Sequence, residues 1–183
     1  MTGTELSDTD LLLLSRTRPE MLGFVYERHA PAVHRYLNRR VGVDAADDLL
    51  GEVFVAAVAG RLRVRPHDSG SALPWLYGIA GNIIRSYRRR SRGHFPVPEV
   101  TVVDWDAVDE RLDAGSRRRE LQVALAGLTE AEREMLLLVA WEGLSPTEAG
   151  QALGLTPVAA RSRLHRARSR AQAALSDMTP AGL

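Results

Sequence analysis

The sequence contains no cysteine, which excludes a disulfide framework, a thiolate zinc site and a cysteine nucleophile. Its aliphatic runs, such as residues 11–14, are far shorter than the ~20 apolar residues of a membrane-spanning helix. The first residues lack a basic region ahead of an apolar core, so we expect no secretory signal. With 45% hydrophobic and 26% charged residues, we expect a soluble, cytoplasmic protein with no membrane insertion.

Lysine is absent as well, because all 24 basic side chains are arginine. Eight arginines lie in residues 61–92 against Asp68 alone, whereas residues 94–115 hold six acids against Arg111. Residues 157–172 hold five arginines and no acid. Since the arginine fork donates paired hydrogen bonds to phosphates and base edges, this order indicates a polyanionic partner. Basic faces that serve only solubility are the plainer alternative.

The residue pattern contains no arrangement of side chains that is typical of an enzyme active site. The five histidines are scattered without metal-ligand spacing, and there is no phosphate-binding glycine loop or nucleophile elbow. Asp47 and Asp48 are adjacent on an expected helix, so their carboxylates diverge. We therefore expect no enzyme activity, no catalytic residue, no metal and no cofactor.

Apolar residues recur at helical spacing along almost the whole chain, which predicts an all-α fold. A first helical stretch is expected over residues 22–37, with a break or restart at Pro31 because proline lacks an amide hydrogen. Two more helices are expected over residues 44–59 and 75–87, with a loop over residues 61–74 between them.

The expected organisation is two small helical domains, residues 1–93 and 117–183. Residues 94–116 begin with prolines, become acidic and have weak periodicity, so we expect an extended acidic linker. In the second domain, Thr129 and Glu132 form a capping box that predicts a helix start.

Two closely spaced helix starts follow in the second domain. Residues 145–148 supply a serine cap, a proline at the first helical position and a capping-box acid, and Gly154 provides a helix end. Thr156 and Pro157 then start a helix that runs to about residue 175. This spacing is typical of a helix-turn-helix, in which Gly150 allows the close approach of the two helices.

The last helix has two contrasting faces. Its inner face is apolar and suited to a core: Ala160, Leu164, Ala167 and Ala171. Its outer face is polar and basic: Arg161, Ser162, His165, Arg166 and Ser169. Such a helix suits insertion into a DNA major groove, and a hairpin with a solvated basic face is the alternative.

Three segments together resemble a known family: Asp-Leu-Leu-Gly-Glu-Val-Phe at residues 48–54, Pro-Trp-Leu-Tyr-Gly-Ile-Ala-Gly-Asn at residues 74–82, and Arg-Ser-Arg-Leu-His-Arg-Ala-Arg at residues 161–168. In this order, with the acidic linker between the second and third, the chain resembles an extracytoplasmic-function sigma factor of the bacterial sigma-70 family over residues 10–175. The resemblance implies a sigma region 2 helical bundle and a sigma region 4 helix-turn-helix. Such a protein binds core RNA polymerase, reads the −10 and −35 promoter elements and helps open DNA.

The resemblance assigns core-polymerase binding, on the β′ clamp helices, to four residues: Asp48, Leu49, Glu52 and Val53. The acids lie one helical turn apart and can meet basic side chains, while Leu49 and Val53 follow on the adjacent face, with a core role as the alternative. Gly51 departs from the family's usual glutamine and Val58 from a frequent tryptophan. The resemblance also implies the polymerase β flap as a partner.

The resemblance assigns −10 recognition to the segment containing Trp75, Asn82, Arg85, Arg88 and Arg89. Asn82 lies where the family places an amide that contacts a flipped base, and the arginines are expected to contact phosphates. Trp75 and Tyr77 offer stacking surfaces, although a core role is the stronger alternative for Trp75.

The resemblance assigns −35 recognition to Arg161, Ser162, His165 and Arg166, which share one helix face, and phosphate contacts to Arg163 and Arg168. It likens the acidic linker to the segment that threads the polymerase cleft and RNA exit channel, with an inert tether as the alternative. An anti-sigma factor is a further candidate partner.

Two other classes of protein stay open from the residues alone. A stand-alone helix-turn-helix transcriptional regulator would explain the second domain but neither residues 48–54 nor residues 75–82. A helical interaction protein, such as an adaptor, would leave the basic helices unexplained.

Overall fold

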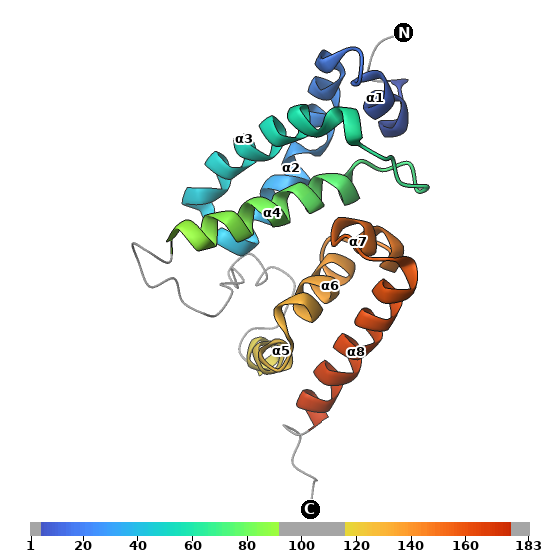
Figure 1. Cartoon of the computed structure of the whole chain (residues 1–183). Coiled ribbons are helices and arrows are strands. Elements are labelled where there is room, and N and C mark those ends of the chain that lie inside the picture. Colours follow the sequence, from blue (N-terminus) through green and yellow to red (C-terminus); the bar gives the residue numbers. More distant parts are fainter. Residues whose placement is uncertain (1–4, 92–115, 177–183) are drawn as a thin grey trace, which may run out of the picture. The chain divides into compact units, whose positions relative to one another are not determined.

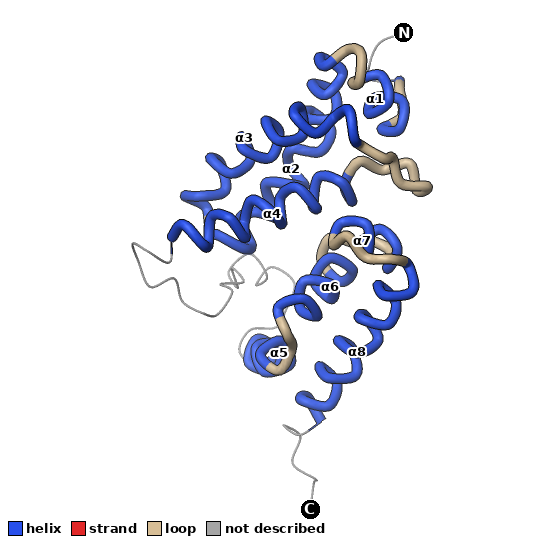
Figure 2. The backbone as a smooth tube through the Cα atoms, viewed as in Figure 1, coloured by secondary structure: helices blue, strands red, loops and turns tan. Residues whose placement is uncertain are grey.

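The computed structural model describes residues 5–91 and 116–176, and the chain divides into two compact units, Met1–Asp104 and Trp105–Leu183 (Figure 1). In the described ranges every regular element is a helix, which confirms the expected all-α fold (Figure 2). The expected linker lies outside these ranges, apart from Ser116. None of the helices in these ranges combines the length and the apolar composition that a membrane span requires.

The first unit is a bundle of three long helices with a short helix packed beside it (Figure 1). Its elements are α1 (Asp8–Leu14), η2 (Pro19–Met21), α2 (Leu22–Val41), α3 (Val43–Gly60), η3 (Arg61–Arg63) and α4 (Leu73–Ser91). Helices α2, α3 and α4 contact one another pairwise, and α1 packs on α2. Their apolar stripes meet in a core that includes Val25, Val33, Leu37, Leu49, Val53, Leu76 and Ile84. Burial of these side chains is the main stabilisation of the unit.

Helix α2 continues through Pro31, so the expected break there is wrong. Proline removes one helical hydrogen bond, the one to the Glu27 carbonyl, and Pro31 faces solvent, where water can satisfy that oxygen. Val25 on one side of the proline and Val33 and Tyr36 on the other are buried in the same core. Tertiary packing therefore holds the two halves of α2 in line.

A single glycine joins α2 to α3. Gly42 has φ of +84°, a left-handed conformation that other residues adopt only at a cost. Its amide donates to the Asn38 carbonyl at 2.9 Å, and its carbonyl accepts from Ala46 at 3.2 Å. The chain thus leaves one helix and enters the next within one residue, which sets α3 antiparallel beside α2 (Figure 2).

The second unit consists of α5 (Ser116–Ala126), α6 (Glu130–Ala140), α7 (Pro146–Ala152) and α8 (Pro157–Ser176). Its core contains Leu125, Leu128, Leu137 and Ala167, with Leu121, Leu136 and Trp141 packed against it. The two predicted capping boxes are confirmed, Thr129 with Glu132 at α6 and Ser145 with Glu148 at α7.

The turn between α7 and α8 brings the two helices close together, as predicted. Gly154 lies in this turn, just after the end of α7, and has a left-handed φ of +67°. A Cβ atom added at Gly150 would lie 2.7 Å from Cβ of Ala160, a distance that real Cβ atoms do not tolerate. The predicted close approach at Gly150 is therefore confirmed.

Candidate functional surfaces

Helix α3 presents an acidic face to solvent. Asp44, Asp48 and Glu52 are exposed and follow one another at intervals of one helical turn. The predicted pair Asp48 and Glu52 therefore shares one accessible surface. Leu49 and Val53, the other two predicted docking residues, are 2% and 0% exposed.

The burial of Leu49 and Val53 corrects their assignment as docking residues on the face adjacent to the acids and agrees with the core role given as the alternative. Both point inward, because α3 must fill the space between α2 and α4 with its apolar positions. Their side chains are not accessible to a docking protein in this structure. Their contribution to any α3 interface is to hold the helix against the bundle.

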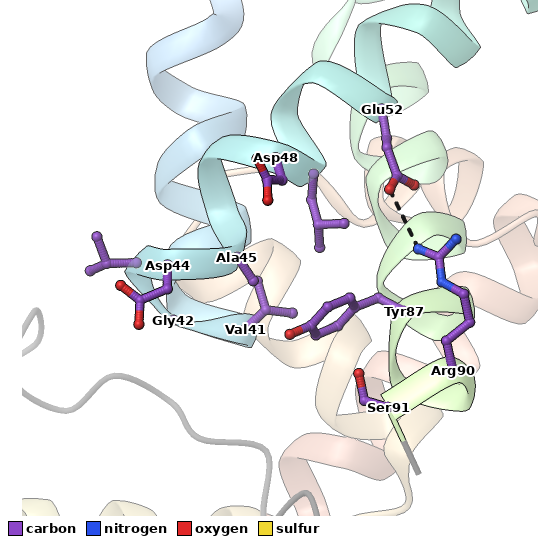
Figure 3. Close-up of a pocket in the computed structure, with 11 residues that line it drawn as sticks. Val41, Gly42, Asp44, Ala45, Asp48, Glu52, Tyr87, Arg90 and Ser91 are labelled. Carbon is purple, nitrogen blue, oxygen red and sulfur yellow. Dashed lines mark hydrogen bonds and ion pairs between the residues drawn. The ribbon is translucent and has the colours of Figure 1, made fainter. Parts of the chain in front are cut away.

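The acidic face borders an open pocket of about 610 Å³ (Figure 3). The α2–α3 turn, the first half of α3 and the last turns of α4 line it, and the ring of Tyr87 points from α4 toward the first turn of α3. Arg90 Nη2 lies 3.4 Å from Glu52 Oε1 across the rim. Both side chains are about half exposed, so this ion pair adds little stability and is easily exchanged for another partner.

An apolar strip continues the α3 surface beyond the acids. Val55, Val58 and Leu62 are 72%, 42% and 61% exposed. They recur at helical spacing with Gly51, a pattern visible in the sequence that our sequence interpretation did not use. The exposed side of α3 is thus acidic toward its beginning and apolar toward its end.

Helix α4 presents a polar and basic face. Asn82, Arg85 and Arg89 are all exposed and lie three and four residues apart, so the structure places them on one side of the helix. Arg85 Nη2 donates a hydrogen bond to the Asn82 amide oxygen. The amide nitrogen of Asn82 can still donate to an incoming base.

Trp75 and Arg88 are less exposed than the three residues of the α4 face. Trp75, in the first turn of α4, is partly buried, and its Cζ2 would lie 3.9 Å from a Cβ added at Gly60. Arg88 is also partly buried, and its Nη2 donates to the Arg40 carbonyl at 3.2 Å. The structure thus separates Arg88 from the freely exposed Arg85 and Arg89.

Tyr77 lies in the core, which corrects the expectation that it offers a stacking surface for a base. Tyr77 is 3% exposed, and its ring stacks on that of Tyr36 at 4.7 Å between centroids. The guanidinium of the buried Arg40 lies 3.6 Å from the other ring's centroid, that of Tyr36. The three side chains form a cluster that joins α2 to α4.

A loop, residues 64–72, connects η3 to α4. Its two ends are buried at Val64 and Ala72, while Arg65, Asp68 and Ser69 between them are exposed. The tip is a turn in which the Gly70 amide donates to the His67 carbonyl at 2.9 Å. The loop therefore has fixed ends and an accessible tip, directly before the α4 face.

Asp8 contacts the end of this loop, which the sequence interpretation missed. Its Oδ2 accepts from the Ala72 amide at 2.9 Å and lies 2.6 Å from Nε2 of His29, and its Oδ1 accepts from Arg28. Burial alone would raise the pKa of Asp8, but the Ala72 amide, His29 and Arg28 together hold that pKa below its usual range. Asp8 is thus an ionised carboxylate inside the unit.

Helix α8 separates its two faces as predicted. Ala160, Leu164 and Ala167 are buried and Ala171 is partly buried, while the four predicted −35 residues are exposed on the other side: Arg161, Ser162, His165 and Arg166. Among the residues the structure describes, no group of histidine or acidic side chains could hold a metal ion.

One acid anchors the arginines of α8. Glu132 is 5% exposed, and its carboxylate accepts from Arg170 at 2.8 Å and lies 4.0 Å from Nε of Arg166. Hydrogen bonds from the Thr129 amide and hydroxyl, followed by the charge of Arg170, lower the pKa of Glu132. Glu132 therefore fixes the positions of Arg166 and Arg170 on α8.

Comparisons with known proteins match both units. The family models Sigma-70 region 2 and Sigma-70, region 4 match residues 25–93 and 118–170. RNA polymerase sigma factor CarQ of Myxococcus xanthus is 34% identical over 157 residues, which cover 84% of this chain and 88% of CarQ. ECF RNA polymerase sigma factor ShbA of Streptomyces griseus is 36% identical over 151 residues, which cover 75% of this chain and 76% of ShbA.

Solved structures give the same fold. CnrH, in complex with the cytosolic domain of CnrY, matches with a TM-score of 0.60 at 24% identity, over 94% of this chain and 99% of that chain. The sigma factor RpoE of Bartonella quintana, in complex with the anti-sigma factor NepR, matches with a TM-score of 0.56 at 20% identity, over 87% and 99%. At these identities the likeness establishes the fold.

Proposed function

The chain belongs to the sigma-70 family of RNA polymerase sigma factors, in its extracytoplasmic-function group, and from this premise we propose how its surfaces divide the work. As a sigma factor it binds core RNA polymerase and directs promoter-specific initiation. The region 2 match over residues 25–93 disfavours a stand-alone helix-turn-helix regulator. We propose that the chain has no active site of its own and acts in the cytoplasm, where the polymerase supplies the catalysis.

This proposal rests on the opposite charges of two faces in the first unit. The exposed side of α3 carries Asp44, Asp48 and Glu52, whereas the exposed side of α4 carries Arg85 and Arg89. A carboxylate face repels DNA phosphates and attracts basic protein surfaces, and an arginine face does the reverse. One unit can therefore hold the polymerase and the promoter at the same time.

Asp48 and Glu52 bind the β′ clamp helices in this proposal. Glu52 exchanges its half-exposed partner Arg90 for a basic side chain of the polymerase, at little cost because exposed ion pairs are weak. Leu49 and Val53 contribute only by anchoring α3 in the core.

The α4 face and the loop over residues 64–72 read the −10 element. Asn82 contacts the edge of an extruded base once Arg85 releases its amide oxygen, and Arg85 and Arg89 contact phosphates. Trp75, partly buried at the same end of α4 as the loop, supports this surface.

The outer face of α8 reads the −35 element in the major groove. Arg161, Ser162, His165 and Arg166 contribute the base contacts, with the second unit bound to the β flap. The exposure of all four side chains and the close α7–α8 turn support this role.

We also propose that an anti-sigma protein controls this chain by covering these surfaces. The support is by analogy, since the matched structures of CnrH and RpoE were solved with CnrY and with the anti-sigma factor NepR. Because this chain has no cysteine, any thiol-based redox sensing would reside in the partner. Pull-down from the native host, followed by loss of transcription on addition of the captured protein, tests this control.

Polymerase docking is tested by size-exclusion chromatography of the chain with bacterial core RNA polymerase. We expect the wild type to co-elute with the polymerase and the Asp48→Arg/Glu52→Arg variant to elute alone. The matched control is Glu20→Arg/Glu27→Arg, which makes the same charge change at exposed positions outside α3 and should still co-elute. Co-elution of the α3 variant, or loss with both variants, contradicts the assignment of docking to α3.

A further inference from the structure

We propose that α1, together with Arg16 just after it, braces both ends of the loop over residues 64–72, and that Asp8 is a positioning residue for −10 recognition. The functional half of this inference rests on the proposed role of the loop in reading the −10 element. The structural half rests on contacts between segments about fifty to sixty residues apart in the chain, Arg16 with Val64 and Asp8 with Ala72.

The contact at the end of the loop fixes the start of α4. The Ala72 amide donates to Asp8 Oδ2 at 2.9 Å, while the Ala72 carbonyl accepts the Leu76 amide at 3.1 Å, in the first turn of α4. Ala72 is 0% exposed, so its amide has no access to solvent. A buried amide that lost this acceptor would be left unsatisfied, which is costly. Asp8 therefore determines where the loop ends and α4 begins.

The contact at the start of the loop comes from the other end of the same segment. Arg16 Nη2 donates to the Val64 carbonyl at 2.7 Å, and Val64 is 2% exposed. Beside the tip, a Cβ added at Gly70 would lie 4.0 Å from Thr9 Oγ1, so α1 also passes close to the turn. The short segment from Asp8 to Arg16 thus contacts the loop at its beginning and its end and passes close to its turn.

Helix α2 holds the Asp8 carboxylate in the orientation that this contact needs. Arg28 donates to Oδ1 and also, through Nη2, to the Leu6 carbonyl at 3.1 Å, while His29 Nε2 lies 2.6 Å from Oδ2. Hydrogen bonds with an ionised partner are stronger than neutral ones. Because three groups share this carboxylate, Asp8 has little freedom to turn away from Ala72.

A braced loop suits the recognition of an extruded base. The tip residues have to present a fixed set of donors and acceptors, and a loop that is ordered beforehand does not lose that conformational entropy on binding. If the ends were released, we expect the tip to accept a wrong base nearly as well as the right one. The brace would therefore act on −10 discrimination and leave −35 discrimination unchanged.

The structural half is tested by amide hydrogen exchange of Ala72 in the free chain, measured by NMR. We expect Asp8→Ala to speed this exchange by about tenfold or more, because a buried charge-assisted hydrogen bond is lost. Asp10→Ala is the matched control, since it makes the same change in α1 at an exposed acid whose hydrogen bonds are to Ser7, and it should have a smaller effect. Unchanged exchange at Ala72 in Asp8→Ala overturns the brace.

The functional half is tested with holoenzyme reconstituted from this chain and core RNA polymerase. The measurement is the ratio of open-complex formation on a preferred promoter to that on single-base −10 variants, with −35 variants as the internal reference. We expect Asp8→Ala and Arg16→Met each to lower the −10 ratio by about tenfold, an effect comparable to one mismatched base pair. Asp8→Asn, which keeps an oxygen for the Ala72 amide, should restore part of the ratio.

The possible outcomes distinguish the structural brace from its role in −10 recognition. An equal loss of −10 and −35 discrimination, or the same loss with Asp10→Ala, would mean that Asp8 acts only on stability and would overturn its positioning role. Faster Ala72 exchange combined with a −10 ratio that no loop or α4 variant changes would leave the brace standing and refute the proposed reading of the −10 element by this unit. Arg16→Met keeps the test decisive if Asp8→Ala does not fold.

Discussion

Arg170 of α8 donates a hydrogen bond of 2.8 Å to the carboxylate of Glu132, which lies 38 residues earlier in the first turn of α6. The same carboxylate accepts from the Thr129 amide and hydroxyl and lies 4.0 Å from Arg166. A single buried acid therefore both caps α6 and fixes the orientation of α8. Because Arg166 belongs to the proposed −35 surface, the stability of the second unit and the placement of that surface depend on the same group.

The Glu132→Gln variant should distinguish the contribution of the Glu132 charge to stability from the contribution of its helix cap. Glutamine can still cap α6, but it loses the charge that Arg170 and Arg166 face, so we expect a lower Tm of the second unit at pH 7. The pKa of Glu132 is lowered in the folded chain, so its contribution is complete above the usual carboxyl pKa of 4.5 and is lost as the pH falls through the lower folded value. Thermal melts at several pH values should show wild type and variant converging in acid. A gap that stays constant would mean that the charge plays no part.

The Gly150→Ala variant should destabilise the helix-turn-helix. Its Cβ would lie 2.7 Å from Cβ of Ala160, so α7 and α8 would have to move apart at an estimated cost of about 1–3 kcal/mol. Gly127→Ala is the control, since nothing lies within 4 Å of a Cβ there. Chemical denaturation followed by circular dichroism measures both. Equal stability of the two variants would contradict the tight packing at this turn.

The Arg161→Ala variant should relax specificity at one promoter position. A bidentate arginine contact to a base edge contributes about 1–3 kcal/mol of discrimination, so holoenzyme with this variant should tolerate substitutions at one −35 base. The measurement is binding to a set of promoters, each with one −35 base changed. A uniform loss across the set would identify Arg161 as a phosphate contact.

The Arg89→Ala variant should weaken binding to all promoters alike. Phosphate contacts carry no sequence information, and each one lost lowers the dependence of the binding constant on salt by about one counterion. Titrations of holoenzyme at several salt concentrations should show a smaller slope but an unchanged order of promoter preference. A change in that order would assign a base contact to Arg89.

Helix starts and the close α7–α8 approach were predictable because they depend on local chemistry. Capping boxes such as the one at Thr129 and Glu132 satisfy backbone groups within one turn, and the value of a small residue at Gly150 follows from the short turn that comes after it. These features need no information about distant segments. The family resemblance was readable for the same reason, since each of its three motifs is a continuous segment.

The errors arose where distant segments decide the outcome. Packing of α2 against α3 and α4 overrides the local cost of Pro31, and the same bundle buries Leu49, Val53 and Tyr77, which look accessible in a motif. Asp8 is a residue that the sequence interpretation missed because its role depends on a distant segment. Its sequence neighbours give a helix start, but its role depends on Ala72, 64 residues away.

Each unit of the chain buries an apolar core of its own, one around α2 to α4 and one around α5 to α8. Substitutions in one core should therefore leave the melting of the other unchanged. During evolution, the unit proposed to contact one promoter element can therefore accumulate changes without loss of folding in the unit proposed to contact the other. Promoter preference can then drift one element at a time.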